Sequence, residues 1–210
     1  MTVSSMNSPK TLRFRTKMNQ GIRVEDMSIS REILINTDKK KLKTFDCCPE
    51  YMKDNDCILT GYRVDYSYPQ SWFSLFQCHN ETGNVWTHLL GTLLFLGLII
   101  YTWFAPIHEL ATMEERLVLT IFLVLHCYTL LCSSMFHLHL CVSEEAFKFW
   151  GCLDFSGISA SIGGGAISIM YFLLHCDGGM RIFWIGSLVI MNLVGIIGPV
   201  FKLTNQLLNL

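Results

Sequence analysis

Two ionisable side chains stand out because they lie in or beside long apolar stretches. Asp154 is the one Asp, Glu, Lys or Arg within residues 149–174, and a charged side chain inside a membrane span costs roughly 2.5–3.5 kcal/mol. A buried carboxylate therefore needs a cation, a metal ion or a proton to neutralise its charge. Upstream, Ser133 and His137 are four residues apart, which places them on one face of a helix. His126 falls three helical turns before His137, so these side chains predict one polar stripe.

The chemistry depends on whether His137 and Asp154 meet. His137 follows one apolar run and Asp154 lies near the beginning of the next, so we expect both near the same membrane face, with His88 close to that face too. Imidazole nitrogen and carboxylate oxygen are zinc ligands, and a catalytic zinc site keeps one position for water. The alternative is a buried hydrogen bond between His137 and Asp154, and the spacing leaves both open. His139 points elsewhere on the helix and is predicted to be interfacial.

The elements that must position these side chains are four apolar runs. They are residues 85–105, 117–136, 149–174 and 182–201. Crossing a hydrocarbon core of ~30 Å at ~1.5 Å per residue takes about 20 residues, so each run is long enough to span a membrane as a helix. Four buried helices of a soluble protein are the rival interpretation, but such helices would need polar faces that these runs lack.

The charged residues are unevenly distributed. Of the 33 (16 Lys and Arg plus 17 Asp and Glu), residues 1–84 hold 22 and residues 85–201 hold 10. With 51% hydrophobic and 16% charged residues, this split describes a polar arm joined to a membrane-embedded body. The net charge of −1 excludes a generally basic nucleic-acid binder. The arm carries 12 of the 16 Lys and Arg, which favours a cytosolic arm.

Three domains are predicted from these patterns. Residues 1–66 form a cytosolic, largely flexible arm, residues 67–84 an amphipathic interfacial segment, and residues 85–210 the membrane domain. In the interfacial segment, Trp72, Phe73 and Phe76 lie at helical spacing just before the first span. Simple anchoring at the membrane interface and a part in closing the polar site are both open.

Small residues recur along the third run. Gly157, Ser161 and Gly165 follow one another at four-residue spacing, and further small residues lie around them, namely Ala160, Gly163, Gly164 and Ala166. Such a pattern favours close helix packing, and room for a ligand or lipid chain is the alternative. The nine cysteines include no Cys-x-x-Cys pair, so neither a disulfide framework nor a thiolate zinc module is predicted.

Three blocks of the sequence resemble a known membrane family. Residues 75–91, LFQCHNETGNVWTHLLG, are similar to the signature entering the first helix of the progestin and adipoQ receptor family, which includes the adiponectin receptors. The pair Ser133 and His137 resembles the second-helix motif of that family, and residues 153–158, LDFSGI, its third-helix motif. The blocks come in the family's order, and their details look nearer the adiponectin-receptor branch than the steroid-receptor branch.

The resemblance implies an all-α membrane protein, with four transmembrane helices here of an expected seven-helix bundle and a cytosolic N-terminus. It implies zinc near the cytosolic side, held by His137 and Asp154 together with two histidines of a His-x-x-x-His motif on the seventh helix. Ser133 would lie beside the metal as the candidate catalytic residue. The implied chemistry is hydrolysis of lipid amides, notably ceramide, by a zinc-activated water.

The sequence departs from the family pattern after its fourth apolar run. It ends at Leu210 and contains no His-x-x-x-His, so three helices and two ligands of the pattern are missing. We therefore expect a fragment, a short isoform or a gene-model product, with weak zinc binding and no turnover of its own. His88 and His126 are retained as an additional polar site.

The sequence thus predicts a multi-pass receptor of this family whose parent protein couples zinc-dependent lipid-amide hydrolysis to signalling. The alternative is a non-catalytic membrane scaffold or anchor, with a structural metal site or none. The expected partners are membrane lipids, an extracellular hormone or lipid ligand, and further copies in an oligomer, but no nucleic acid. The expected location is the plasma membrane or the Golgi. An ion channel or transporter is disfavoured because the spans offer one carboxylate and no repeated polar lining.

Overall fold

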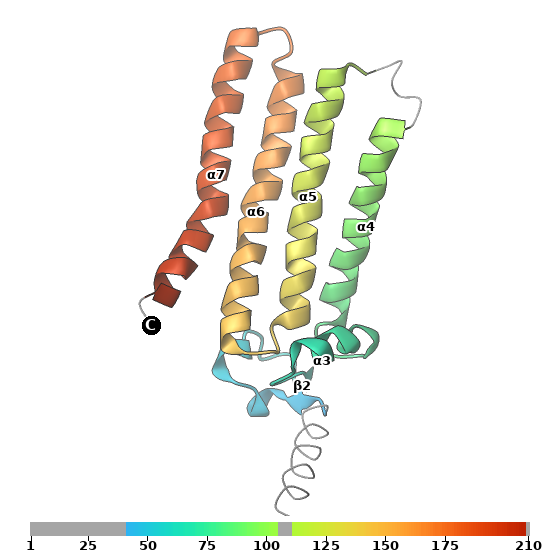
Figure 1. Ribbon diagram of the computed structural model, residues 1–210, viewed down its shortest axis with the longest axis vertical. Coiled ribbons are helices and arrows are strands. Elements are labelled where there is room, and N and C mark those ends of the chain that lie inside the picture. The colour runs from blue at the N-terminus through green and yellow to red at the C-terminus, as the bar shows by residue number, and fades with distance from the viewer. Residues whose placement is uncertain (1–40, 105–110, 209–210) are drawn as a thin grey trace, which may run out of the picture. The chain divides into compact units, whose positions relative to one another are not determined.

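Four long helices dominate the computed structural model, which describes residues 41–104 and 111–208, with side chains through Phe201 (Figure 1). The short elements are β1 (Lys43–Thr44), η1 (Phe45–Cys47), η2 (Glu50–Met52), β2 (Thr60–Tyr62), α3 (Tyr68–Phe73) and η3 (Ser74–Phe76). The long helices are α4 (Thr82–Phe104), α5 (Met113–His139), α6 (Glu144–Leu173) and α7 (Gly178–Leu208). All four are long and apolar enough to cross a membrane, which confirms the four predicted spans.

The long helices form a row in chain order. Each packs against its neighbour in sequence: α4 on α5, α5 on α6, and α6 on α7 (Figure 1). One end of the row comprises the start of α4, the end of α5 and the start of α6, and α3 lies there and contacts α5. We call this end the α3 end. The chain topology therefore brings the predicted site residues of three helices to one end of the bundle.

Capping side chains fix where the helices begin. Ser67 and Gln70 form a reciprocal capping box at the start of α3, with the Gln70 side chain accepting from the Ser67 N–H at 2.9 Å. Thr112 and Glu115 form the same box at the start of α5, and Ser143 caps α6 through its side chain. Because the caps set the first residue of α5 and α6, they also set the depth at which each helix carries its polar residues.

The chain before α4 is folded from residue 41 onward, where the sequence predicts a largely flexible arm as far as residue 66. We call residues 41–81 the pre-membrane segment. β1 and β2 pair in antiparallel fashion with an irregular register. A small core joins the segment to the turn between α5 and α6, and its members are Cys48, Met52, Tyr62, Val64, Tyr66, Leu140 and Cys141. The apolar residues of the pre-membrane segment complete their core with residues of that turn. Residues 1–40 lie outside the described residues.

Small residues let the helices approach closely, as the packing interpretation predicts. The Thr129 hydroxyl on α5 donates to the Gly157 carbonyl on α6 at 2.6 Å, and a Cβ added at Gly157 would meet the Thr129 backbone. Gly163 faces Asn192 of α7, whose amide donates to a carbonyl of α6 at 3.2 Å. Gly165, in contrast, has nothing within 4 Å of an added Cβ. Beyond Gly157, the residues of α6 that pack against neighbouring helices therefore do not follow the predicted four-residue spacing.

Replacing Gly163 by alanine should weaken the packing of α7 on α6, because the added Cβ would overlap the Asn192 side chain. We expect a loss of about 1–3 kcal/mol, typical of overpacking, measured as a lower thermal midpoint in detergent. Gly165→Ala is the matched control on the same helix and should be neutral or stabilising by up to ~1 kcal/mol. Equal destabilisation by both variants would contradict this packing.

Candidate functional site

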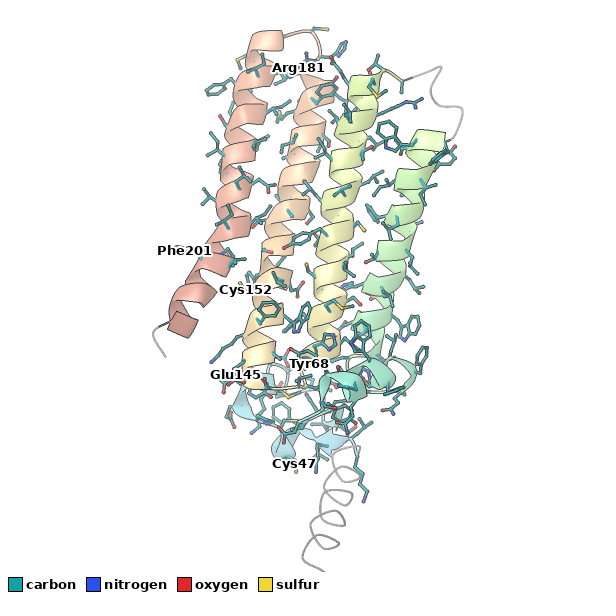
Figure 2. All side chains as sticks on the ribbon, viewed as in Figure 1. Cys47, Tyr68, Glu145, Cys152, Arg181 and Phe201 are labelled. Carbon is teal, nitrogen blue, oxygen red and sulfur yellow. The ribbon has the colours of Figure 1, made fainter. Side chains whose placement is uncertain are left out.

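Three of the residues that the sequence singles out lie at the α3 end. His88 comes from the second turn of α4, His137 from the last turn of α5, and Asp154 from α6. The imidazole rings of His88 and His137 are 5.7 Å apart between centroids. Asp154 lies on the neighbouring helix α6, about three turns after its first residue. Figure 2 shows Tyr68 at this end of the bundle and Arg181 at the opposite end. The structure thus brings His88 and His137 side by side, with Asp154 on the adjacent helix α6.

His137 is bound by a carboxylate that the sequence analysis did not assign to the site. Its Nδ1 lies 2.8 Å from Oε2 of Glu81, the residue just before α4. The side chains of His137 and Glu81 are 20% and 13% exposed. The alternative of a direct hydrogen bond from His137 to Asp154 is therefore wrong for this nitrogen, because Glu81 occupies it.

Glu81 is an ionised acceptor in this arrangement. Its carboxylate also accepts from the side-chain amides of Asn80 at 2.7 Å and Asn84 at 2.8 Å. Burial alone would raise the pKa of Glu81, but hydrogen bonds from His137 and Asn84 outweigh burial and hold it below its ordinary value. An ionised carboxylate has no proton to donate, so the His137 ring is the donor in their hydrogen bond.

The backbone of His137 is held as well, by Arg63 of the pre-membrane segment. The Arg63 guanidinium is 1% exposed and donates to the carbonyls of His137 at 2.7 Å and Leu138 at 3.0 Å. It also donates to the Ser74 hydroxyl at 2.6 Å. The last carbonyls of a helix have no partners within the helix, and arginine side chains commonly supply them. Burial lowers the pKa of Arg63, which nevertheless stays charged because the ordinary value is so high.

His139, predicted to be interfacial, is buried at 2% exposure beneath α3. Its Nδ1 lies 2.7 Å from the Ser71 hydroxyl. The rings that surround it belong to Tyr68, Trp72 and Trp150. Ser71 and His139 have the atom types of a nucleophile and its base, but both are almost completely buried, and Ser71 also donates to the Tyr68 carbonyl at 2.9 Å. The pair is therefore a structural link between α3 and α5.

Two predicted residues remain: Ser133 lies near the site, and His126 lies away from it. Ser133 is buried at 7% exposure and lies one turn before His137 on the same face of α5. His126 is in contact with aromatic rings: it lies 5.4 Å from Phe95 in a stacked arrangement, and its Nδ1 is 2.9 Å from the Phe122 carbonyl. Within the described residues, no three His, Cys, Asp or Glu side chains are grouped closely enough to hold a metal ion.

Sequence reasoning missed Glu81 and Arg63 as parts of the site. Glu81 lies within the family signature and is the last charged residue before the first span, a position that could have drawn attention to it. Arg63 offers no such signal, because its partners are backbone carbonyls and a serine hydroxyl far away in the sequence.

These features define an integral, multi-pass membrane protein with a buried polar site at one end of its bundle. Residues 76–209 match the haemolysin-III related family, and the chain belongs to that family of membrane receptors, which confirms the resemblance found in the sequence. The family is the one that includes the progestin and adipoQ receptors and the adiponectin receptors.

Three relatives show the extent of the similarity. Heptahelical transmembrane protein 1 of Arabidopsis thaliana is 32% identical over 76% of this chain and 50% of its own length. The adiponectin receptor protein of Drosophila melanogaster is 31% identical, over 71% of this chain and 34% of its own length. Progestin and adipoQ receptor family member 3 of Homo sapiens is 34% identical, over 73% of this chain and 50% of its own length. The chain thus spans half or less of the length of these relatives.

His79 is a buried base beside the site. It is 8% exposed, and its Nδ1 accepts the backbone N–H of Glu81 at 3.1 Å. Burial, followed by the positive charge of Arg63, lowers the pKa of His79 to about 4. Protonation of Nδ1 would remove the acceptor for Glu81 and place a second cation near Arg63.

The protein should lose stability as the pH falls from about 6.5 to about 4. An unfolded His79 binds a proton near its ordinary pKa of ~6.5, whereas the folded residue resists protonation down to about 4, so the unfolded state takes up the proton first. The His79 contribution is complete above this window, and its loss is on the order of 3 kcal/mol. Thermal midpoints in detergent across this pH range would measure it. His79→Asn keeps an acceptor but cannot titrate, so it should make the profile less steep; an unchanged slope would contradict the assignment.

Proposed function

We propose that this protein is a membrane receptor of the adiponectin-receptor type whose α3 end binds zinc and couples lipid-amide hydrolysis, of ceramide for example, to signalling. The pre-membrane segment would lie on the cytosolic side of the plasma membrane or the Golgi membrane, as the excess of Lys and Arg in the arm favours. The observation that carries the proposal is the approach of the His88 and His137 rings to 5.7 Å between centroids, with the Glu81 carboxylate already bound to the His137 ring.

The residues at the α3 end fit zinc by their chemistry. The His88 Nδ1 atom is buried and has no hydrogen-bond partner among the described residues, and buried polar atoms without partners are rare in folded proteins. Neutral imidazole nitrogen and carboxylate oxygen are the ligands zinc takes. Ligating histidines usually donate their other ring N–H to a carboxylate, as His137 does to Glu81. The ligand count is short within the described residues, so we expect this chain to bind zinc weakly.

Each residue of the site would have a separate role. His137 and Asp154 would hold the ion, with the His88 ring beside that of His137. Zinc supplies a Lewis acid that makes hydroxide available near neutral pH. Ser133, buried on the same face of α5 as His137, would donate a hydrogen bond that positions the amide group of the substrate.

His137→Ala should lower the zinc affinity of the purified protein by more than about 100-fold, because loss of a ligand exceeds the 10–100-fold effect of losing a ligand's supporting partner. Competition with a chromophoric chelator in detergent would measure the affinity. His126→Ala removes a histidine of the same helix that packs on aromatic rings, and it should bind zinc as the wild type does. Equal affinities in the two variants would argue against the assignment of His137.

The second candidate function is a membrane anchor or scaffold without catalysis. The observation that favours it is that the described residues bring no three metal ligands together. Ceramide hydrolysis by the purified parent protein in proteoliposomes separates the two functions. Turnover that disappears in His137→Ala would support the enzyme, whereas zinc binding without turnover would favour the scaffold.

We also propose that the outer face of α3 and η3 lies in the membrane interface. Its aromatic side chains point outward, with Trp72 50%, Phe73 73% and Phe76 81% exposed, whereas Ser71 and Ser74 are fully buried. An amphipathic segment with aromatic residues on its free face suits the boundary between lipid head groups and acyl chains. The two roles that the sequence left open then coexist, because the serine face covers the site while the aromatic face anchors.

Phe73→p-benzoylphenylalanine should form photo-cross-links to lipid in native membranes, because its ring would lie among lipid chains. The matched position is Leu59, which is 66% exposed and precedes β2. The same replacement at Leu59 should give little lipid cross-linking, since β2 lies on the side of the segment away from the helices (Figure 1). Mass spectrometry of the cross-linked protein would count the lipid adducts, and similar yields at both positions would refute the interfacial placement.

A further inference from the structure

His137 is held at both its side chain and its backbone by residues of the pre-membrane segment. Glu81 binds the ring and Arg63 binds the carbonyl. We infer that Glu81 is the positioning residue of the metal site: its carboxylate keeps the proton of His137 on Nδ1 and so leaves the lone pair of Nε2 free for a metal ion. This inference rests on the proposed function, because it takes His137 as a zinc ligand.

The hydrogen bonds around Glu81 decide which nitrogen carries the proton. Both carboxylate oxygens already accept N–H groups, Oε1 from Asn80 and Oε2 from Asn84. These amides are donors, so the carboxylate needs no proton of its own and acts as an acceptor only. The contact to His137 at 2.8 Å therefore requires a proton on Nδ1. A neutral imidazole has a single N–H, so Nε2 is the nitrogen with the free lone pair.

The same contacts fix the direction of the ring. His137 lies in the last turn of α5, where a helix end would otherwise fray. Arg63 bonds the carbonyls of His137 and Leu138 and thereby holds that turn. With the backbone held by Arg63 and Nδ1 held by Glu81, the ring has little freedom to rotate. The His137 ring is thus set beside His88 before any metal arrives.

Glu81 is not assigned as a zinc ligand. Its carboxylate accepts three hydrogen bonds, from His137, Asn80 and Asn84, which leaves one acceptor site, on Oε1. Asp154, on the neighbouring helix, remains the carboxylate for the metal. A purely structural role for Glu81 would also give a hydrogen bond to His137, so the test must include a property other than stability.

The tautomer of His137 is that property. In metal-free protein in nanodiscs at about pH 8.5, above the ordinary histidine pKa, two-bond ¹⁵N–¹H correlations distinguish Nδ1–H from Nε2–H. The His137 signals are assigned by their loss in His137→Gln. We expect Nδ1–H in the wild type and a shift toward Nε2–H in Glu81→Ala. Glu81→Gln keeps the size of the side chain and an acceptor oxygen, so it should retain Nδ1–H.

Zinc affinity is the second measurement. Glu81→Ala should bind zinc about 10–100-fold more weakly than the wild type, as is typical when the partner of a ligating histidine is lost. Glu81→Gln should lose less, because its one oxygen can keep the hydrogen bond from His137, although its NH2 group replaces the oxygen that accepts from Asn80. Glu144→Ala is the matched control, since Glu144 is an exposed glutamate at the same end of the bundle that pairs with Lys148. It should leave both tautomer and affinity unchanged.

The outcomes separate this inference from the proposed function. An Nε2–H tautomer in the wild type overturns the inference without any variant, and an unchanged tautomer in Glu81→Ala overturns it as well. A shifted tautomer with weaker zinc binding supports it. If the wild type binds no zinc, the proposed function fails, and a shifted tautomer still shows that Glu81 sets the state of His137.

Discussion

The end of α5 is the point on which the rest of the structure depends. Its last carbonyls have no partners within the helix, and at the buried α3 end they cannot rely on water. Arg63 supplies the missing donors, and as a buried cation it in turn requires acceptors, which are the carbonyls of His137 and Leu138 and the Ser74 hydroxyl. This mutual requirement fixes the pre-membrane segment against the bundle. The segment then leads directly into α4, which explains why Glu81 reaches the His137 ring.

The unusual orientation of α3 follows from the same contacts. A short helix at the surface of a soluble protein would bury its aromatic residues and expose its serines. Here Ser74 accepts from Arg63, and Ser71 pairs with His139, so the serine face must be inside. The aromatic residues Trp72, Phe73 and Phe76 are then left on the outside of α3 and η3. Polar requirements inside the protein thus produce an apolar surface outside it.

The sequence allowed prediction of what depends on local properties. Apolar length identified four spans, and short connections placed His137 and Asp154 at one end, because two helices joined by a tight turn must share that end. Contacts between residues far apart in the chain could not be predicted from the sequence: Glu81 and His137 are 56 positions apart, and Arg63 and His137 are 74 apart. The folding of residues 41–66 was missed for the same reason, since their apolar residues form a core only with Leu140 and Cys141. The burial of His139 was not predicted, because nothing local shows that α3 covers it.

The composition of the α3 end bears on the choice between a receptor enzyme and an anchor. Buried ionic or polar pairs can often be replaced by apolar residues with no loss of stability, or with a gain. A bundle end that served only to anchor the chain would be at least as stable with apolar side chains in place of His88, His137 and Glu81. Instead it keeps a histidine whose buried Nδ1 has no partner within the described residues, beside a second histidine already held by a carboxylate. Such an arrangement makes physical sense when a further positively charged group completes it, and a metal ion is the simplest group that accepts imidazole and carboxylate ligands together.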